Sequence, residues 1–381
     1  SGWITFEEAT TTDPLAVARG FPNATEPLRI VVPQFLEHKA GQTNPAAGRH
    51  NIISLTLMPN VDIRASDGSA ISLTGIPSFT AYDGSSTKQY PAQQATQIKL
   101  KPGPGDAAAF NRVLGKLSPL PPPSNTVDAC SWDARQGIVT CFIAKGQRLE
   151  GHQRYVISFK ITNADRNINT PTLYLGANAD APFKPAEVSQ PDAPAGGVKN
   201  GANAFYITRP EFVRTMIWQS TPVAGAANTI AITLSPNFDL DGSSIISISG
   251  LNKSGLGALV TLASSPAIFC HQGNGTEAGY AVYDDSVATL SMQICSGANL
   301  TAGHEVVVKF NLTNPNVRQS SPDISVSATG SSTGSPVFRA QAINKSGAVW
   351  QGVVGRGHGP LELCRSRSRG RSRSCTQSHS G

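Results

Sequence analysis

The sequence contains an internal repeat, and this feature limits the possible folds more than any other. The segment NIISLTLMPNVDI, which starts at Asn51, recurs as NTIAITLSPNFDL from Asn228, at an offset of 177 residues. The later parts of the two copies align at an offset of 151 residues, which pairs Phe159 with Phe310. Because each copy is long enough to bury its own core, the repeat predicts two separately folded units.

Hydrophobic and polar residues alternate inside both copies, for example at Ile53, Leu55 and Leu57. Side chains of a strand point alternately to opposite faces, so this period predicts half-buried strands of antiparallel sheets. Charged residues make up only 15% of the chain, which leaves little material for exposed helix faces. We therefore predict an all-β protein with two tandem immunoglobulin-like antiparallel β-sandwich domains.

The alignment of the two copies also predicts the domain boundaries. We expect one sandwich at residues 28–182 and the other at residues 205–335, with a linker at 183–204. Residues 1–27 would be the end of a preceding repeat or a linker. Residues 336–381 would form a linker and a disordered Arg/Ser-rich C-terminal tail, because the run CRSRSRGRSRSC cannot bury apolar surface.

The tail holds most of the net charge of +6, so nothing in the predicted folded body favours nucleic acid. The chain also has no run of 18 apolar residues, so we expect no membrane span within it.

Four cysteines lie inside the predicted units. Cys130 and Cys141 flank a turn and would face each other across a hairpin, close enough to bridge. Cys270 and Cys295 both fall in the second unit, at positions that do not align with the first pair. We predict the disulfides Cys130–Cys141 and Cys270–Cys295, formed in an oxidising compartment. Four buried thiols are the alternative.

Sequons for N-glycosylation occur along the chain, and those at Asn274 and Asn299 lie in glycine-rich or turn-like contexts. We predict these two as glycosylation sites. Together with the disulfides, they predict an extracellular or cell-surface location.

One segment copies the opening of a calcium loop. Asn237, Asp239 and Asp241 place oxygens at alternate positions, and Gly242 follows as the sixth residue. The twelfth position is Ile248 where such loops have Glu. A strand end followed by an Asx-Gly turn explains the pattern better. A calcium ion held between two sandwiches is the alternative.

Other candidate chemistry is sparse. Trp132 and Tyr283 occupy aligned positions, where an aromatic residue usually packs in a sandwich core; an exposed sugar-stacking surface is the alternative. The seven histidines form no ligand pair, and no nucleophile motif or phosphate-binding loop is present. We predict no catalytic residues and no cofactor, and therefore a protein that is not an enzyme.

The segments QSTPVAGAANTIAITLSPNFDL and FNLTNPNVRQSSPDISVSA, with the hairpins that contain Trp132 and Tyr283, carry a family likeness. They resemble modules found in tandem in very large surface or secreted proteins of unicellular algae. The resemblance covers roughly residues 28–335. It implies repeated β-sandwiches in an extracellular structural or adhesive protein, and it brings no catalytic residues.

The main functional prediction is a non-enzymatic structural or adhesive spacer module of a tandem-repeat extracellular or cell-surface protein. Its partners would be neighbouring repeats of the same chain, with glycans or other surface proteins as further candidates. A carbohydrate- or calcium-dependent binding module is the alternative. A further alternative is an RNA-associated protein that acts through the Arg/Ser tail.

Overall fold

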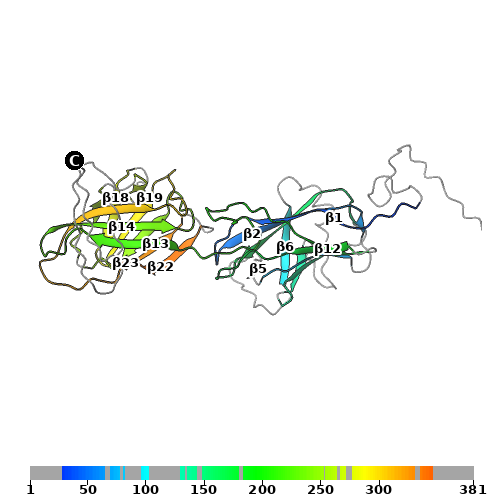
Figure 1. The fold of residues 1–381 in the computed structure, drawn as a ribbon, viewed down its shortest axis with the longest axis horizontal. Coiled ribbons are helices and arrows are strands. Elements are labelled where there is room, and N and C mark those ends of the chain that lie inside the picture. Colours follow the sequence, from blue (N-terminus) through cyan, green and yellow to red (C-terminus); the bar gives the residue numbers. More distant parts are fainter. Residues whose placement is uncertain are drawn as a thin grey trace, which may run out of the picture.

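The computed structural model describes residues 28–64, 69–77, 80–81, 96–102, 129–133, 135–143, 148–179, 183–252, 254–263, 267–271, 277–330 and 335–345. Within these ranges the chain is all-β, with strands and turns and no helix, as the alternating sequence pattern predicts. The strands form two bodies that follow one another along the long axis (Figure 1). The Arg/Ser tail and residues 1–27 lie outside the described residues.

The first unit is built from a continuous set of antiparallel strands that folds into two layers. The order is β1-β2-β10-β6-β7-β8-β4-β11-β12, with β5 (Thr80–Ala81) also paired to β10, and β3 (Ile63–Arg64) pairs with β9 (Arg148–Leu149). β6 pairs with β10 through residues 100–102 and with β7 through residues 96–99, so it passes from one layer to the other. The main strands are β1 (Phe35–Gln42), β2 (His50–Pro59), β4 (Ala70–Thr74), β6 (Thr96–Pro102), β7 (Ala129–Asp133), β8 (Ile138–Phe142), β10 (Tyr155–Thr162), β11 (Tyr174–Asn178) and β12 (Phe183–Glu187).

The second unit has two separate sheets. One has the order β20-β14-β13-β23, and the other has the order β16-β18-β19-β15-β21-β22, with β17 paired to β19. All pairings are antiparallel except that of β23 with β13. The strands are β13 (Phe212–Gln219), β14 (Ala227–Pro236), β15 (Ile245–Ser249), β16 (Leu259–Thr261), β17 (Phe269–Cys270), β18 (Tyr280–Asp284), β19 (Thr289–Ile294), β20 (Val306–Thr313), β21 (Ser325–Thr329), β22 (Val337–Ala342) and β23 (Asn344–Lys345).

Each unit has its own hydrophobic core, to which both of its layers contribute. The alternate residues of β2 and β10 point into the first core, as their sequence period predicts. Trp132 and Tyr283 are both buried in these cores. The hydroxyl of Tyr283 donates a hydrogen bond to the Leu251 carbonyl at 2.9 Å. Because both rings are buried, neither forms an exposed sugar-stacking surface.

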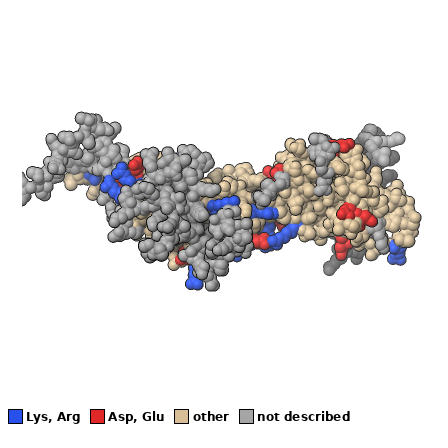
Figure 2. Space-filling view, turned by 180° about the vertical axis from the view of Figure 1, so that it is seen from behind, with Lys and Arg blue, Asp and Glu red and all other residues tan. Residues whose placement is uncertain are grey.

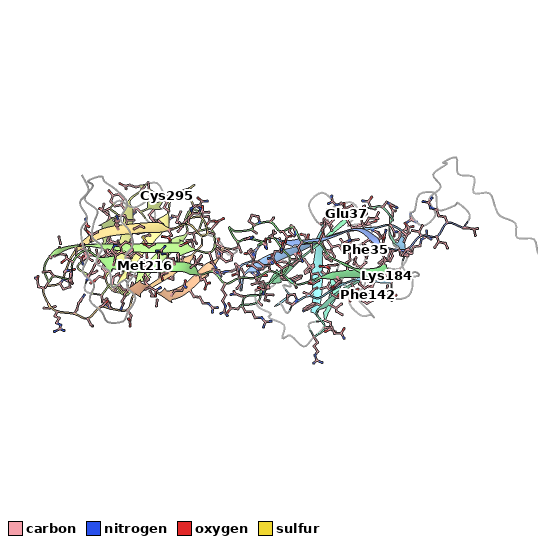
Figure 3. The ribbon with its side chains drawn as sticks, viewed as in Figure 1. Phe35, Glu37, Phe142, Lys184, Met216 and Cys295 are labelled. Atoms are coloured by element: carbon pink, nitrogen blue, oxygen red, sulfur yellow. A yellow bond between two sulfur atoms is a disulfide. The ribbon has the colours of Figure 1, made fainter. Side chains whose placement is uncertain are left out.

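The last strand of each unit lies beyond the boundary that the repeat alignment predicts. β12 pairs with β11, and the buried ring of Phe183 lies 4.9 Å from that of Phe35, which Figure 3 labels. β22 pairs with β21 in the same way, and the Phe338 ring lies 4.9 Å from that of Phe212. Residues 183–187 and 336–345 therefore belong to the folded units rather than to linkers. Both strands bury few side chains, so their alternation is too weak to mark them in the sequence.

The structure contains both disulfides that the cysteine spacing predicts. Cys130–Cys141 joins β7 to β8 across the hairpin, with the Cα atoms 4.4 Å apart. Cys270–Cys295 joins β17 to the end of β19, with the Cα atoms 5.0 Å apart. All four cysteines are buried, and Cys130 and Cys141 belong to the first core.

Candidate functional site: the joint between the units and the groove of the second unit

A triad of side-chain amides closes one end of the first unit. Asn51 Nδ2 donates to Gln42 Oε1 at 2.9 Å and to Asn163 Oδ1 at 3.0 Å. Asn51 Oδ1 accepts from the backbone N–H groups of Thr43 and Asn44 at 3.2 and 3.0 Å. Asn51 is almost fully buried, and these bonds satisfy both ends of its amide while they tie β1, β2 and the chain after β10 together.

The second unit carries the same triad at the aligned positions. Asn228 Nδ2 donates to Gln219 Oε1 at 3.0 Å and to Asn314 Oδ1 at 2.8 Å. Asn228 Oδ1 accepts from the backbone N–H groups of Ser220 and Thr221 at 3.1 and 3.2 Å. The same polar device therefore closes the same end of both units.

In the first unit a further segment docks against the triad. We call residues 188–208, which link β12 to the second unit, the connector. Gln42 Nε2 donates to the carbonyls of Gly201 and Tyr206 at 2.9 and 2.6 Å, and Gln42 Oε1 accepts from Phe205 N–H at 2.9 Å. The Phe205 side chain is fully buried in the first core. The connector thus completes the first unit rather than serving as a free linker.

The connector also forms backbone hydrogen bonds on both sides of its path. Gln42 N–H donates to the Ala202 carbonyl at 2.9 Å, which attaches the connector to the end of β1. On the other side, Ile168 and Ile207 exchange two backbone hydrogen bonds at 2.7 and 2.9 Å. The connector therefore fills the space between β1 and the chain that follows β10.

The same connector reaches into the second unit and forms the joint. Asp239 N–H donates to the Gly196 carbonyl at 2.9 Å, and the buried Val198 of the connector belongs to the second core.

The connector also holds a loop of the first unit at the joint. Thr208 N–H donates to the Pro45 carbonyl at 2.9 Å, and Ala47 N–H donates to the Thr208 carbonyl at 3.0 Å. Ala46, which lies between Pro45 and Ala47, is fully buried within the core of the second unit. First-unit residues and the connector thus supply part of the second unit's packing.

Charged side chains surround this joint. Arg339 Nη2 lies 2.6 Å from Asp165 Oδ2, and Arg209 Nη2 donates to the Asp165 carbonyl at 2.6 Å. Figure 2 shows basic and acidic side chains close together where the two bodies meet. The Arg339–Asp165 pair is well exposed, so it contributes little to stability.

The predicted calcium candidates lie near this joint, where they form hydrogen bonds within loops. Asn237 Oδ1 accepts from Glu211 N–H and its Nδ2 donates to the Arg209 carbonyl, both at 2.8 Å. The aligned Asn60 makes the corresponding bonds in the first unit. Its Oδ1 accepts from a backbone N–H and its Nδ2 donates to a backbone carbonyl of the segment just before β1, both at 2.9 Å. This amide therefore holds the entry to the first long strand of each unit.

The two aspartates of the candidate calcium loop are also engaged. Asp239 Oδ1 accepts from Ala302 N–H at 2.9 Å, as Asp62 Oδ1 accepts from Gly151 N–H at 2.9 Å in the first unit. Asp241 Oδ1 accepts from a serine hydroxyl three residues later, at 2.7 Å. The bond of Asp239 joins two loops that are distant in the chain, and the bond of Asp241 lies within one turn. No cluster of three or more His, Cys, Asp or Glu side chains suited to a metal occurs among the described residues.

A groove with a volume of about 470 Å³ lies beside the amide triad of the second unit. It runs between the end of β13, the chain after β15 and residues 315–322. Gln219 and Gln319, which line it, align with Gln42 and Ile168 of the first unit. The groove therefore occupies the place where the connector docks in the first unit.

Two polar atoms in the groove lining are buried and have no hydrogen-bond partner, the indole Nε1 of Trp218 and the hydroxyl Oγ of Ser254. Ser254 is 8% exposed. Buried polar groups without partners are rare in folded proteins because each loses its bonds to water. These two atoms therefore mark the groove as a place where a hydrogen-bonding group would be favoured.

Of the two predicted glycosylation sites, the structure describes one. Asn299 is exposed in the turn after β19, where its side chain is accessible, and it stays a prediction. Asn274 lies outside the described residues.

The triads, the connector and the groove were not predicted from the sequence. The aligned glutamines Gln42 and Gln219 were visible in the repeat, but the connector residues that bind Gln42 lie far away in the chain. An alignment of the polar residues alone, at the repeat offsets of 177 and 151 residues, would have revealed the triads. The connector has no alternating pattern that would have revealed it.

Comparisons with known proteins give no family. No family model matches the chain, and no curated protein matches it. The resemblance to algal surface modules thus stays a prediction. Among the described residues, no helix is long and apolar enough to cross a membrane.

Several solved structures show a distant similarity. One is the C-terminal domain of the antigen I/II-family protein AspA of Streptococcus pyogenes, at 8% identity and a TM-score of 0.38, over 81% of this chain and 97% of that one. Another is a serine-rich repeat adhesion glycoprotein of Streptococcus agalactiae, at 7% identity and a TM-score of 0.20, over 82% and 97% of the two chains. Scores at this level do not establish a shared fold.

Proposed function

We propose that this chain is a non-enzymatic spacer of an extracellular or cell-surface protein, in which β-sheet units are joined end to end by docked connectors. The observation that supports this proposal best is the double burial at the joint. Phe205 of the connector lies in the first core, while Ala46 of the first unit lies in the second core. Phe205 anchors the connector to the first unit. Separating or rotating the units would expose Ala46 and the connector residue Val198, which both belong to the second core, so the joint favours a fixed orientation.

The extracellular location is supported by the two buried disulfides, because such bonds persist in oxidising compartments. The neighbouring units of the same polypeptide are the proposed partners. An array of such units would act through its length and stiffness, and no reacting groups are needed for that role.

The alternative of a calcium-dependent module has less support, since the oxygens of Asn237, Asp239 and Asp241 are used in loop hydrogen bonds. The RNA-binding alternative depends on residues 356–381, which lie outside the described residues.

A binding screen tests the spacer proposal against these alternatives. We expect the melting temperature of the full chain to be the same with calcium and with a chelator, because no calcium-dependent contact is needed for folding. We also expect no saturable binding to a glycan array. A calcium-dependent rise in the melting temperature, or saturable binding of one glycan class, would contradict the proposal and favour a binding module.

A further inference from the structure

We propose that the groove of the second unit is a docking site for an extended, uncharged polypeptide segment of the connector type. This inference rests on the proposed spacer function, because it treats the groove as the counterpart of the place that the connector fills in the first unit. The occupant is defined by the segment that fills the first groove, residues 201–207. That segment has no charged residue and buries most of its side chains.

The receptor groups are the same in the two units. In the first unit, Gln42 offers Oε1 to Asn51, and its Nε2 clamps two carbonyls of the connector. In the second unit, Gln219 offers Oε1 to Asn228 in the same way. Gln42 is buried beneath the connector, whereas Gln219 is exposed at the groove. The amide that clamps the connector is therefore in place and accessible.

The chain also begins the same path in both units. Ser189, at the start of the connector, forms a parallel bridge with Lys39 of β1. In the second unit Asn344 of β23 pairs in parallel with Met216 of β13, which Figure 3 labels. Met216 aligns with Lys39, so β23 is the first step of a connector. Lys345, the next residue, already lines the groove.

The groove differs from its counterpart at one position. Gly41 lies under the first connector, where a Cβ atom would meet the Ala202 carbonyl at 3.4 Å. The second unit has Trp218 at this position, so an occupant must pass over the indole ring. The unpartnered Nε1, which is a donor only, is closed off from solvent, so it would donate to a backbone carbonyl of the occupant once the ring turns out of its buried position. Another polar group of the occupant would bond to the unpartnered hydroxyl of Ser254.

The test uses the full chain and the synthetic peptide NGANAFYIT, which copies residues 200–208. We expect saturable binding by calorimetry, together with a shift of the Trp218 indole N–H resonance, assigned by Trp218→Phe. The peptide with Ala in place of its Phe should bind at least tenfold more weakly, because that side chain is the apolar anchor of the first joint.

The variant Gln219→Glu provides the sharpest comparison. It keeps an oxygen that can accept from Asn228, but it replaces the Nε2 donor with an oxygen that repels peptide carbonyls. We expect at least a tenfold loss of peptide affinity. The control Gln153→Glu makes the same change at an exposed site in the first unit and should leave the affinity unchanged.

Absence of binding by the native-sequence peptide, or equal affinity with Gln219→Glu, would overturn the inference. A saccharide that binds and shifts the Trp218 resonance would also overturn it. Sugar hydroxyls can donate to the carboxylate of Gln219→Glu, so a saccharide would keep its affinity for this variant where the peptide would lose it. The orientation of the two units does not depend on this groove. The inference can therefore fail while the spacer function stands, and an unfixed joint between the units would contradict the spacer function on its own.

Discussion

At the scale of the residue, the most informative side chain is Asn51, because its amide is both a donor and an acceptor and uses both capacities in a buried place. An aspartate has the same shape and no donor. A Ser or Ala would leave the neighbouring amides unpaired. The recurrence of Asn at the aligned position 228 follows from this double requirement.

We predict that Asn51→Asp destabilises the first unit by about 3 kcal/mol, since it places a carboxylate against the oxygens of Gln42 and Asn163 in a buried site. Urea unfolding of the full chain, with hydrogen exchange to locate the change, measures this effect. The matched control Asn178→Asp, at an exposed position, should change the unfolding free energy by less than about 0.5 kcal/mol. Equal effects of the two substitutions would refute the structural role of the triad.

The sequence could predict much at this scale, but only where the partners are close in the chain. The bond between Cys130 and Cys141 followed from a short hairpin. The calcium-like pattern at Asn237 and Asp239 was ambiguous, because the same oxygens serve a loop as well as an ion. The partners of Gln42 in the connector lie more than 150 residues away, so no local pattern could reveal them.

At the scale of the element, the connector matters most, because it has no regular secondary structure and still fills a place in the core. Alternation predicted β2 and β10 because their inner faces are uniformly apolar. It missed β12, which buries one large residue, and the repeat alignment assigned residues 188–204 of the connector to a linker. The backbone of the connector bonds to side chains and to chain without regular secondary structure. Its sequence therefore has no regular alternation of apolar and polar residues.

We predict that Phe205→Ala destabilises the first unit by about 3–5 kcal/mol, although residue 205 comes after all of that unit's strands. The physical reason is the cavity left in the first core. Denaturant unfolding with hydrogen exchange should place the loss at β1 and β10 of the first unit. Val213→Ala, at an exposed position of β13, is the control and should have little effect. A loss confined to the second unit would contradict the assignment of Phe205.

The disulfide between β7 and β8 gives a second prediction for an element. Replacing both partners, as Cys130→Ser with Cys141→Ser, should lower the unfolding free energy of the first unit by about 2–4 kcal/mol, because the unfolded chain gains freedom. The second unit, with its own bond at Cys270–Cys295, should be unaffected. Chemical denaturation of each variant, with peptide mass mapping of the remaining bond, checks both statements. Equal loss in both units would show that they do not fold separately.

At the scale of the whole molecule, the joint decides whether the two units behave as one rod or as two independent bodies. Three features contribute to it: the connector, Ala46, and the contacts of Asp165 with Arg209 and Arg339. The buried contacts should dominate, since exposed ion pairs contribute little. The repeat could predict two units, but it could not predict their joint, because that depends on segments which the two copies do not share.

We predict that Arg339→Ala changes the unfolding free energy of either unit by less than about 1 kcal/mol, because its bond to Asp165 is exposed to water and screened by salt. Thermal unfolding at low and high salt measures this. A loss of several kcal/mol would mean that the ion pair, rather than the docked connector, holds the joint together.

Small-angle X-ray scattering of the full chain tests the central claim, that a docked connector fixes two β-sheet units end to end. The account predicts a pair-distance distribution with two maxima, one from distances within a unit and one from distances between units. It also predicts that Phe205→Ala, which undocks the connector, blurs the second maximum. A distribution with a single compact maximum, or a second maximum that is already blurred in the unaltered chain, would contradict it.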